Sequence, residues 1–243
     1  MTTIRSNPPI LRRVARRPAG PMARRLPGLR RAATFLIHRI ADRVAESLDY
    51  HGRVVDLGCG TAPYRRTILE QADEYIGVDW THSVHDQAQV DVFADLSGPV
   101  PIDSESADTV VSFQVMEHLP EPEAFLHECR RLLRPGGRLH LTVPFMWHVH
   151  EAPHDYYRYT RHGLDHLLAK AGFTDIVVRP YAGFWQTMVL KFNYHTLRYA
   201  RGVFVLPFVP LWLIGQWLAP GLDRIDPNPQ EATGYVVSAF RPQ

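Results

Sequence analysis

A dense group of titratable side chains lies between residues 147 and 160. It contains His148, His150 and His154, and the carboxylate of Asp155 directly follows the last of these histidines. Histidine titrates near neutral pH, so each imidazole can accept a proton from a hydroxyl group without a large change in its pKa. We therefore take these four residues as candidate catalytic bases. The spacing of the histidines fits no standard zinc pattern, and no metal site is expected.

The next residues of the same segment suit substrate binding. Tyr157 and Tyr159 can form the walls of a pocket, and the guanidinium of Arg158 can hold an anionic group such as a carboxylate or a phosphate. A structural alternative stays open. In it, Arg158 pairs with an acid under the sheet, and the tyrosines belong to the core with their hydroxyls at its rim.

A glycine-rich turn near the start of the chain indicates a second binding element. The apolar segment 54–57 leads into Gly58, Cys59 and Gly60, and glycines let the backbone approach a ligand without a Cβ in the way. Dinucleotide-binding turns need a third glycine three residues later, where this chain has Pro63. The turn therefore favours a ligand without a pyrophosphate. Cys59 is expected to pack rather than react.

Acidic residues follow the next apolar segments. Asp79 ends the segment 75–79, 19 residues after Gly60, where a carboxylate can accept both hydroxyls of a ribose. Asp95 can accept a hydrogen bond from an exocyclic amine, while Leu96 can pack on the face of a purine. Together with the glycine turn, these residues predict a nucleoside-like ligand.

The elements that must position these residues alternate between strands and helices. The apolar pattern predicts helices over 32–49, 64–71, 121–134 and 160–172, and strands over 54–56, 75–79, 90–93, 109–113, 139–143, 173–179 and 234–240. Such alternation is typical of an α/β fold with a parallel sheet covered on both faces. Ligands of these sheets bind beyond the carboxyl ends of the strands, where the candidate residues lie.

Over residues 50–180 the motifs resemble those of the class I S-adenosylmethionine-dependent methyltransferases, in particular the small-molecule, type 11-like subgroup. The resemblance is carried by the glycine turn, Asp79, the Asp95–Leu96 pair, Glu117-His118-Leu119 and the segment Leu-Arg-Pro-Gly-Gly at 133–137. It implies a Rossmann-like α/β fold, with a seven-stranded mixed sheet of order 3-2-1-4-5-7-6 flanked by helices and an antiparallel seventh strand.

The resemblance also implies S-adenosyl-L-methionine as cofactor and methyl transfer as activity. Asp56, Gly58 and Gly60 would hold the methionine end, Asp79 the ribose, Asp95 and Leu96 the adenine, and Gln114 would lie near the sulfonium; Cys59 and Trp80 complete the cofactor-binding candidates. We expect a small-molecule or a lipid- or glycan-linked acceptor. O-methylation is favoured because of the histidine-rich segment. N- or C-methylation, including of quinone-like acceptors, and a non-catalytic scaffold stay open.

A hydrophobic helical insertion at 181–232 precedes the last predicted strand, within a methyltransferase domain placed at 32–243. From Gly202 to Leu222 there are 21 residues without a charge, almost enough to span a bilayer. A single crossing is not expected, because the strand at 234–240 must return to the same sheet. The segment can lie in a membrane interface, form a lid for a lipidic substrate, or cover the sheet or a dimer interface.

The N-terminal residues 1–31 are interpreted as a basic flexible tail. Residues 1–41 hold ten arginines and no acid, although the whole chain has a net charge of only +2. Together with the insertion, this charge favours peripheral attachment to the anionic inner face of the cytoplasmic membrane, and the two cysteines fit a cytoplasmic protein. Nucleic acid is not an expected partner, because no Asn-Pro-Pro-aromatic motif follows the fourth strand. No pattern indicates an oligomeric state.

Overall fold

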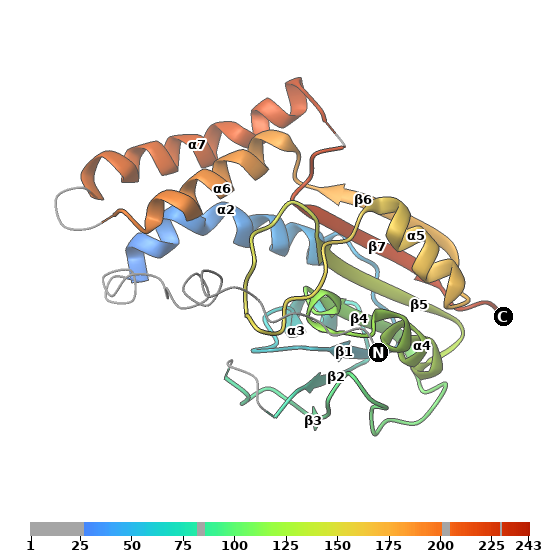
Figure 1. Ribbon diagram of the computed structural model, residues 1–243. Coiled ribbons are helices and arrows are strands. Elements are labelled where there is room, and N and C mark those ends of the chain that lie inside the picture. Colours follow the sequence, from blue (N-terminus) through green and yellow to red (C-terminus); the bar gives the residue numbers. More distant parts are fainter. Residues whose placement is uncertain (1–26, 82–85, 201–204, 229) are drawn as a thin grey trace, which may run out of the picture.

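A seven-stranded sheet forms the centre of the molecule (Figure 1). The computed structural model describes residues 27–81, 86–200, 205–228 and 230–243, so most of the predicted basic tail lies outside the described residues. The strands are β1 (Arg53–Leu57), β2 (Glu74–Asp79), β3 (Val92–Phe93), β4 (Ala107–Phe113), β5 (Leu133–Pro144), β6 (Thr174–Tyr181) and β7 (Gly234–Phe240). Their order is β3-β2-β1-β4-β5-β7-β6, and β7 runs antiparallel to β5 and β6. The predicted sheet order and direction are confirmed.

The strand register brings the candidate residues to one edge of the sheet. Leu57 of β1 pairs with Val78 of β2, and Asp56 pairs with Val111 of β4, all in parallel. The chain therefore leaves these three strands at neighbouring points. The segments that follow them carry the glycine turn, Asp79 and Gln114.

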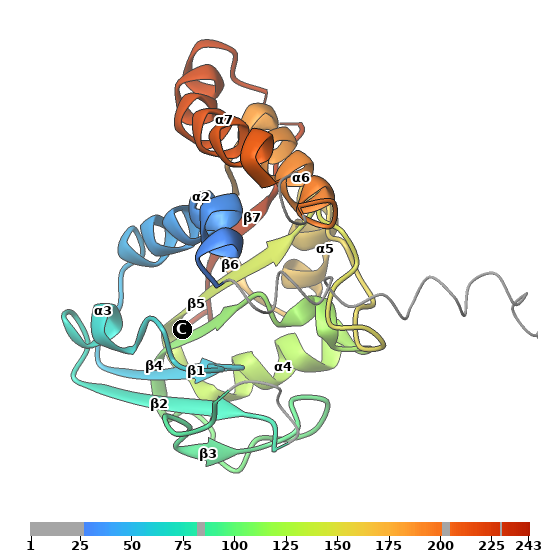
Figure 2. The same ribbon diagram turned by 90° about the vertical axis from the view of Figure 1, so that its left-hand side faces the viewer.

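Different helices cover the two faces of the sheet. Side chains alternate along a strand, so Val55 and Val110 face one core, whereas Val54 and Val111 face the other. The first core includes α4 (Pro122–Leu132) and α5 (Arg161–Lys170), and the second includes α3 (Arg65–Leu69). Figure 2 shows α4 on the opposite side of β4 and β5 from α2 (Pro27–Glu46).

The helix α4 is shorter than the sequence predicts. It ends at Leu132, and the chain turns directly into β5 instead of continuing to residue 134. Pro135 explains the difference, because proline disfavours helical backbone at the residue before it. The helix α5 begins as the sequence predicts. The hydroxyl of Thr160, the residue before it, accepts the backbone N–H of Gly163.

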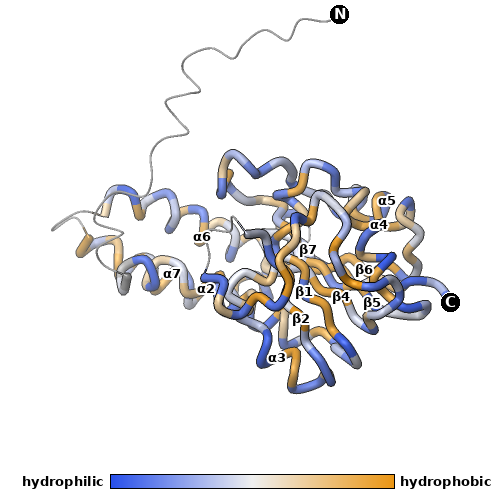
Figure 3. The backbone as a smooth tube through the Cα atoms, turned by 90° about the horizontal axis from the view of Figure 1, so that it is seen from below, coloured by the Kyte–Doolittle hydropathy of each residue, from blue (hydrophilic) through white to orange (hydrophobic). Residues whose placement is uncertain are grey.

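The hydrophobic insertion consists of two helices, α6 (Phe184–Leu197) and α7 (Val205–Ile225), which pack with α2. Figures 1 and 3 show these three helices as a group that extends away from the sheet. The buried amide of Gln216 in α7 joins the group. It donates to the carbonyl of Ala32 at 2.8 Å and accepts the N–H of Leu36 at 3.0 Å. α2 thus begins inside the predicted tail, at residue 27, and α7 supports it at Ala32 and Leu36.

Candidate active site

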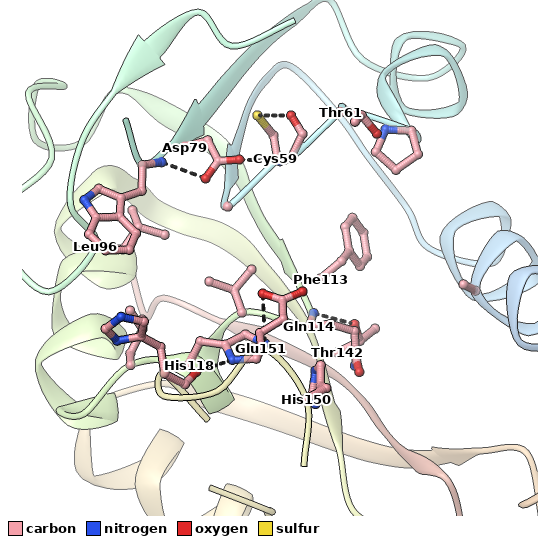
Figure 4. Close-up of a pocket in the computed structure, with 18 of the residues that line it drawn as sticks. Cys59, Thr61, Asp79, Leu96, Phe113, Gln114, His118, Thr142, His150 and Glu151 are labelled. Atoms are coloured by element: carbon pink, nitrogen blue, oxygen red, sulfur yellow. Dashed lines mark hydrogen bonds and ion pairs between the residues drawn. The ribbon is translucent and has the colours of Figure 1, made fainter. Parts of the chain in front are cut away.

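A cavity of about 940 Å³ opens beyond the carboxyl ends of β1, β2 and β4. Figure 4 shows the side chains that converge on it from these strand ends and from the 150–156 segment. The helix α2 contributes an apolar part of the wall, through Ile37, Ile40, Ala41 and Val44. The cavity therefore lies where an α/β sheet binds its ligands, and residues from the histidine-rich segment reach it as well.

The glycine turn is held against the end of β2. The N–H groups of Gly58 and Cys59 both donate to the carbonyl of Val78, at 2.8 and 3.0 Å. Gly58 has φ +79°, and a Cβ at this position would collide with the side chain of Val115. Only glycine fits this position without strain, which keeps the backbone exposed to the cavity.

Asp79 links this turn to the second strand. Its Oδ2 accepts the N–H of Gly60 at 2.9 Å, and its Oδ1 accepts the N–H of Trp80 at 2.6 Å. The carboxylate borders the cavity and is almost fully buried. Each carboxylate oxygen has a second lone pair, so the group can still accept hydrogen bonds from ligand hydroxyls.

Asp56 departs from the prediction, because its side chain does not border the cavity. It lies within β1 on the same face as Val54, and its Oδ2 accepts the hydroxyl of Tyr75 at 2.7 Å. Burial raises the pKa of Asp56 to about 7, against the lowering effect of the Tyr75 hydrogen bond. The alternation of side chains along β1 directs this carboxyl into the core, away from the predicted contact with the methionine end.

Cys59 borders the cavity as a buried thiol. Burial and the nearby carboxylates of Asp56 and Asp79 raise its pKa to about 12. The thiol therefore stays protonated near neutral pH, as a packing residue would.

The predicted adenine-binding residues lie on the same wall. Asp95 and Leu96 both border the cavity, and Oδ1 of Asp95 accepts the N–H of Ser97 at 2.9 Å. Trp80 stands nearby, with its indole edge-on to the ring of His154 at 5.7 Å between ring centroids. This part of the wall thus combines a carboxylate with flat apolar surface.

Gln114 adopts a backbone conformation that is unusual for its type. Its φ is +58°, and its N–H donates to Thr142 of the neighbouring strand. Its side-chain Nε2 donates to the hydroxyl of Tyr181 at 3.2 Å. The sequence did not single out Tyr181, which also borders the cavity, because it lies at the end of a strand far along the chain. Strained backbone of this kind is often found at functional sites.

Of the three candidate histidines, His150 and His154 border the cavity and His148 does not. The ring of His148 packs against Trp147 and Tyr194, at 4.8 and 4.9 Å between ring centroids. Burial lowers its pKa. The structure therefore does not support His148 as a base that reaches a ligand in the cavity.

Asp155 and Arg158 form a partly buried ion pair instead of a base and an anion site. Arg158 donates to both oxygens of Asp155, at 2.6 and 2.8 Å, and Asp155 also accepts the N–H of His150 at 2.7 Å. These donors lower the pKa of Asp155, although burial alone would raise it. Arg158 donates further to the carbonyl of His148 at 2.7 Å. The pair holds the segment in place, in line with the structural alternative.

The two predicted substrate-binding tyrosines point elsewhere. The hydroxyl of Tyr157 donates to the carbonyl of Pro120 at 2.9 Å, and that of the buried Tyr159 to the carbonyl of Met116 at 3.0 Å. Tyr156, which directly precedes them, is the tyrosine of this segment that borders the cavity. Side chains alternate between two sides along an extended segment. Tyr156 therefore faces the cavity, whereas Tyr157 and Tyr159 face the protein.

A cluster that the sequence did not predict lies beside the cavity wall. Glu117 and His118 belong to the short helix η1 (Met116–His118), which follows β4, and His150 follows β5. Oε1 of Glu117 lies 3.8 Å from Nε2 of His118 and 3.9 Å from Nε2 of His150. Glu117 is fully buried, and burial raises its pKa to about 8. Glu117 and His118 belong to the sequence motif at 117–119. Their partner His150 lies 32 positions after His118, so the motif alone does not reveal the cluster.

The comparisons with known proteins agree with this geometry. A family model described as a methyltransferase domain matches residues 28–178, more than half of the chain. The chain belongs to this family. Its members with these motifs are class I S-adenosylmethionine-dependent methyltransferases, as the resemblance implied.

Two curated relatives match the central part of this methyltransferase. The ubiquinone biosynthesis O-methyltransferase of Xanthomonas oryzae pv. oryzae is 32% identical over 113 residues, which are 42% of this chain and 47% of the relative. A probable S-adenosylmethionine-dependent methyltransferase of Mycolicibacterium smegmatis is 34% identical over 133 residues, covering 50% and 49%. The matches span about half the length of these relatives.

Solved methyltransferase structures share the fold at low identity. Phosphoethanolamine N-methyltransferase 2 of Haemonchus contortus, in complex with S-adenosyl-L-methionine, has a TM-score of 0.56 at 16% identity and covers 87% of this chain and 56% of that chain. A possible histamine N-methyltransferase of Thermotoga maritima has a TM-score of 0.54 at 17% identity and covers 85% and 92%. These similarities concern the architecture of the methyltransferase.

The residues of this methyltransferase fit the cofactor of its family. Position 58 leaves no room for a Cβ, so the backbone of the turn itself borders the cavity beside the carboxylate of Asp79. Asp95 and Leu96 provide an acceptor and an apolar surface further along the same wall. This combination of exposed backbone, carboxylate and apolar groups is complementary to an amino acid joined to a nucleoside.

Proposed function

We propose that this methyltransferase transfers a methyl group from S-adenosylmethionine to a hydroxyl group of a small-molecule acceptor. The cluster of Glu117, His118 and His150 supports this proposal most directly. A hydroxyl must lose its proton during or after attack, whereas a neutral amine reacts through its lone pair. Imidazole and carboxylate groups beside the donor pocket are suited to that need.

Bound S-adenosylmethionine supplies a methyl group on a positively charged sulfur. The rest of the cofactor is the leaving group and becomes a neutral thioether. The protein must then position the acceptor oxygen in line with the breaking bond. Gln114 is held by Tyr181 and Thr142 between the glycine turn and the cluster, and so can orient the reacting groups. The α2 wall and the 150–156 segment reduce access of water to the cavity.

The wall formed by α2 gives a further indication about the acceptor. Ile37, Ile40, Ala41 and Val44 make this part of the cavity apolar, so the acceptor should carry a hydrocarbon or aromatic part as well as its hydroxyl. The curated relative named as an O-methyltransferase supports the same reaction type.

The proposal is tested by measuring S-adenosylhomocysteine release with a panel of matched phenols, alcohols and amines. We expect release with hydroxyl acceptors, and loss of release in Asp79→Ala. The Asp73→Ala variant, at an exposed position away from the cavity, serves as control. Turnover confined to the amines, with none for hydroxyl acceptors, would contradict O-methylation.

We also propose that α7 attaches the protein to an anionic membrane surface, from which a lipidic acceptor can enter. Among the described residues, α7 is the one helix with the length and hydropathy of a membrane span, and 17% of its apolar window is buried. Trp212, Gln216 and Ala219 form its buried stripe. Leu206, Trp217 and Ile225 are exposed by 73%, 77% and 82%. An apolar face of this size on a helix that packs along the protein suits the membrane interface.

Vesicle flotation tests the attachment. The protein should float with vesicles that contain phosphatidylglycerol, and the double variant Ile214→Glu/Trp217→Glu should remain unbound. Phe93→Glu, which changes an exposed aromatic residue on β3, is the matched control. Unbound wild-type protein would contradict the proposal. If the wild-type protein stays unbound and forms dimers that the double variant abolishes, α7 is an interface between two copies of the chain instead.

A further inference from the structure

Three potential metal ligands converge beside the methyl-transfer cavity. One ligand atom from each of Glu117, His118 and His150 lies within 4.8 Å of the other two. Two atoms that each lie about 2.1 Å from one ion can be at most about 4.2 Å apart. Both distances from Glu117, 3.8 and 3.9 Å, already satisfy this limit. A small rotation of one imidazole completes the site.

The carboxylate of Glu117 gives an independent indication of a ligand. It is completely buried, and within the described part of the chain neither of its oxygens has a hydrogen-bond partner. Buried polar groups in native proteins are nearly always paired, and buried charges are paired or bind metals. Figure 4 shows His118 and His150 on the wall of the cavity. Their Nε2 atoms lie 3.8 and 3.9 Å from Oε1 of Glu117. A cation among these three groups would satisfy it.

The outer nitrogens of both imidazoles have partners that direct their inner nitrogens toward the cluster. Nδ1 of His118 lies 2.5 Å from the carbonyl oxygen of His154, which can only accept, so Nδ1 is the donor and Nε2 is the nitrogen that faces Glu117. Nδ1 of His150 lies 3.5 Å from Oδ2 of Asp155 and 3.4 Å from Nη2 of Arg158, so the Asp155–Arg158 ion pair borders its outer nitrogen. Metal-binding histidines typically have such carbonyl and carboxylate partners.

We infer that Glu117, His118 and His150 bind a divalent first-row transition-metal ion, which holds the acceptor hydroxyl for methylation. Two imidazoles and one carboxylate favour such an ion over magnesium or calcium. Three protein ligands leave positions open toward the cavity, where an acceptor oxygen can bind and lose its proton more readily. Oε2 of Glu151 lies 4.0 Å from Nε2 of His118, at the edge of this three-residue site. The metal's role rests on the proposed O-methylation.

The first experiment measures metal binding without cofactor or acceptor. Chelator-treated, desalted protein is titrated with ZnCl₂ and with MnCl₂ by calorimetry, and the metal content is measured after dialysis. We expect one ion per chain, and affinity at least about tenfold lower in Glu117→Gln and His150→Ala. His148→Ala, a histidine of the same segment outside the cluster, should bind as wild type does. Thermal unfolding and S-adenosylmethionine binding confirm that each variant is folded.

His150 lies in a partly exposed segment, so its variant tests the site even where Glu117→Gln fails to fold. Absence of binding in wild type, or equal binding in all variants, would overturn the inference. Metal-dependent loss and recovery of turnover with hydroxyl acceptors would support the ion's role, and full turnover in chelator would overturn that role. A protein that binds the ion but methylates only amines would retain the metal site and lose the proposed O-methylation.

Discussion

The backbone N–H of Gly60 donates to Oδ2 of Asp79, which joins the glycine turn after β1 to the carboxylate at the end of β2. The carboxylate therefore has a structural task before any ligand arrives. It holds the turn in the conformation that borders the cavity, and it keeps lone pairs for ligand hydroxyls.

Asp79→Ala should weaken binding of both S-adenosylmethionine and S-adenosylhomocysteine by about tenfold or more, because hydrogen bonds to a charged group each contribute roughly 1.5–3 kcal/mol. Isothermal titration calorimetry measures the two affinities. Asp73→Ala, an exposed carboxylate just before β2, should leave them unchanged. Wild-type affinity in Asp79→Ala would show that this carboxylate does not contact the cofactor.

A second prediction concerns the glycine at the tip of the same turn. Gly58→Ala places a methyl group against Val115 and forces an L-residue to φ +79°. The left-handed conformation alone costs roughly 1–2 kcal/mol, so thermal unfolding should begin at a lower temperature and cofactor affinity should fall. Adding Val115→Ala should recover part of the loss, because it removes the collision but not the backbone strain.

Gly98→Ala is the control for this substitution, since a Cβ there would meet only the carbonyl of Asp95 at an ordinary distance of 3.8 Å. A normal melting temperature in Gly58→Ala would mean that the turn adapts and that its shape does not depend on glycine.

The sheet and the donor side of the cavity could be predicted because local signals encode them. Apolar runs specify the strands, and Gly58, Asp79 and Asp95 each lie at or just after the end of a strand, so their position in the fold follows from the strand order. Asp56 shows the limit of this reasoning. It stands within β1, where the side-chain alternation decides its direction, and that direction depends on which helices cover each face.

The acceptor side of the cavity depends on contacts between distant segments. The sequence marks the 147–160 segment as rich in chemistry, but it does not show that Arg158 pairs with Asp155 or that His148 packs between Trp147 and Tyr194. Glu117 meets His150 only because β4 and β5 are neighbours in the sheet. Side-chain pairing of this kind is a property of the tertiary structure, so spacing alone could not reveal it.

The thiol of Cys59 should be unreactive in the folded protein. Its pKa is raised to about 12 by burial and by Asp56 and Asp79, so almost no thiolate is present at pH 8, and thiolate is the reactive form. Cys129 is completely buried. Iodoacetamide should therefore label neither cysteine of the native protein at pH 8 and both after unfolding in guanidinium, as mass spectrometry would show. Rapid labelling of Cys59 in native protein would indicate that the turn opens.

The last prediction concerns the ion pair beneath the histidine-rich segment. Arg158→Ala leaves the carboxylate of Asp155 without its guanidinium, and the loss of a hydrogen bond between charged groups destabilises a protein by roughly 1.5–3 kcal/mol. Arg158 also binds the carbonyls of Trp147 and His148, so the segment from 147 to 158 should open locally. Faster amide hydrogen exchange confined to this segment, together with a lower melting temperature, is the expected result.

Arg161→Ala, an exposed arginine at the start of α5, is the matched control and should exchange as wild type does. Cofactor affinity should change little in Arg158→Ala, because the residues expected to hold the cofactor lie on β1, β2 and the segment after β3. If the variant instead keeps its stability and loses only acceptor binding, Arg158 contacts the acceptor directly, as the sequence alone suggested, and the ion pair is of secondary importance.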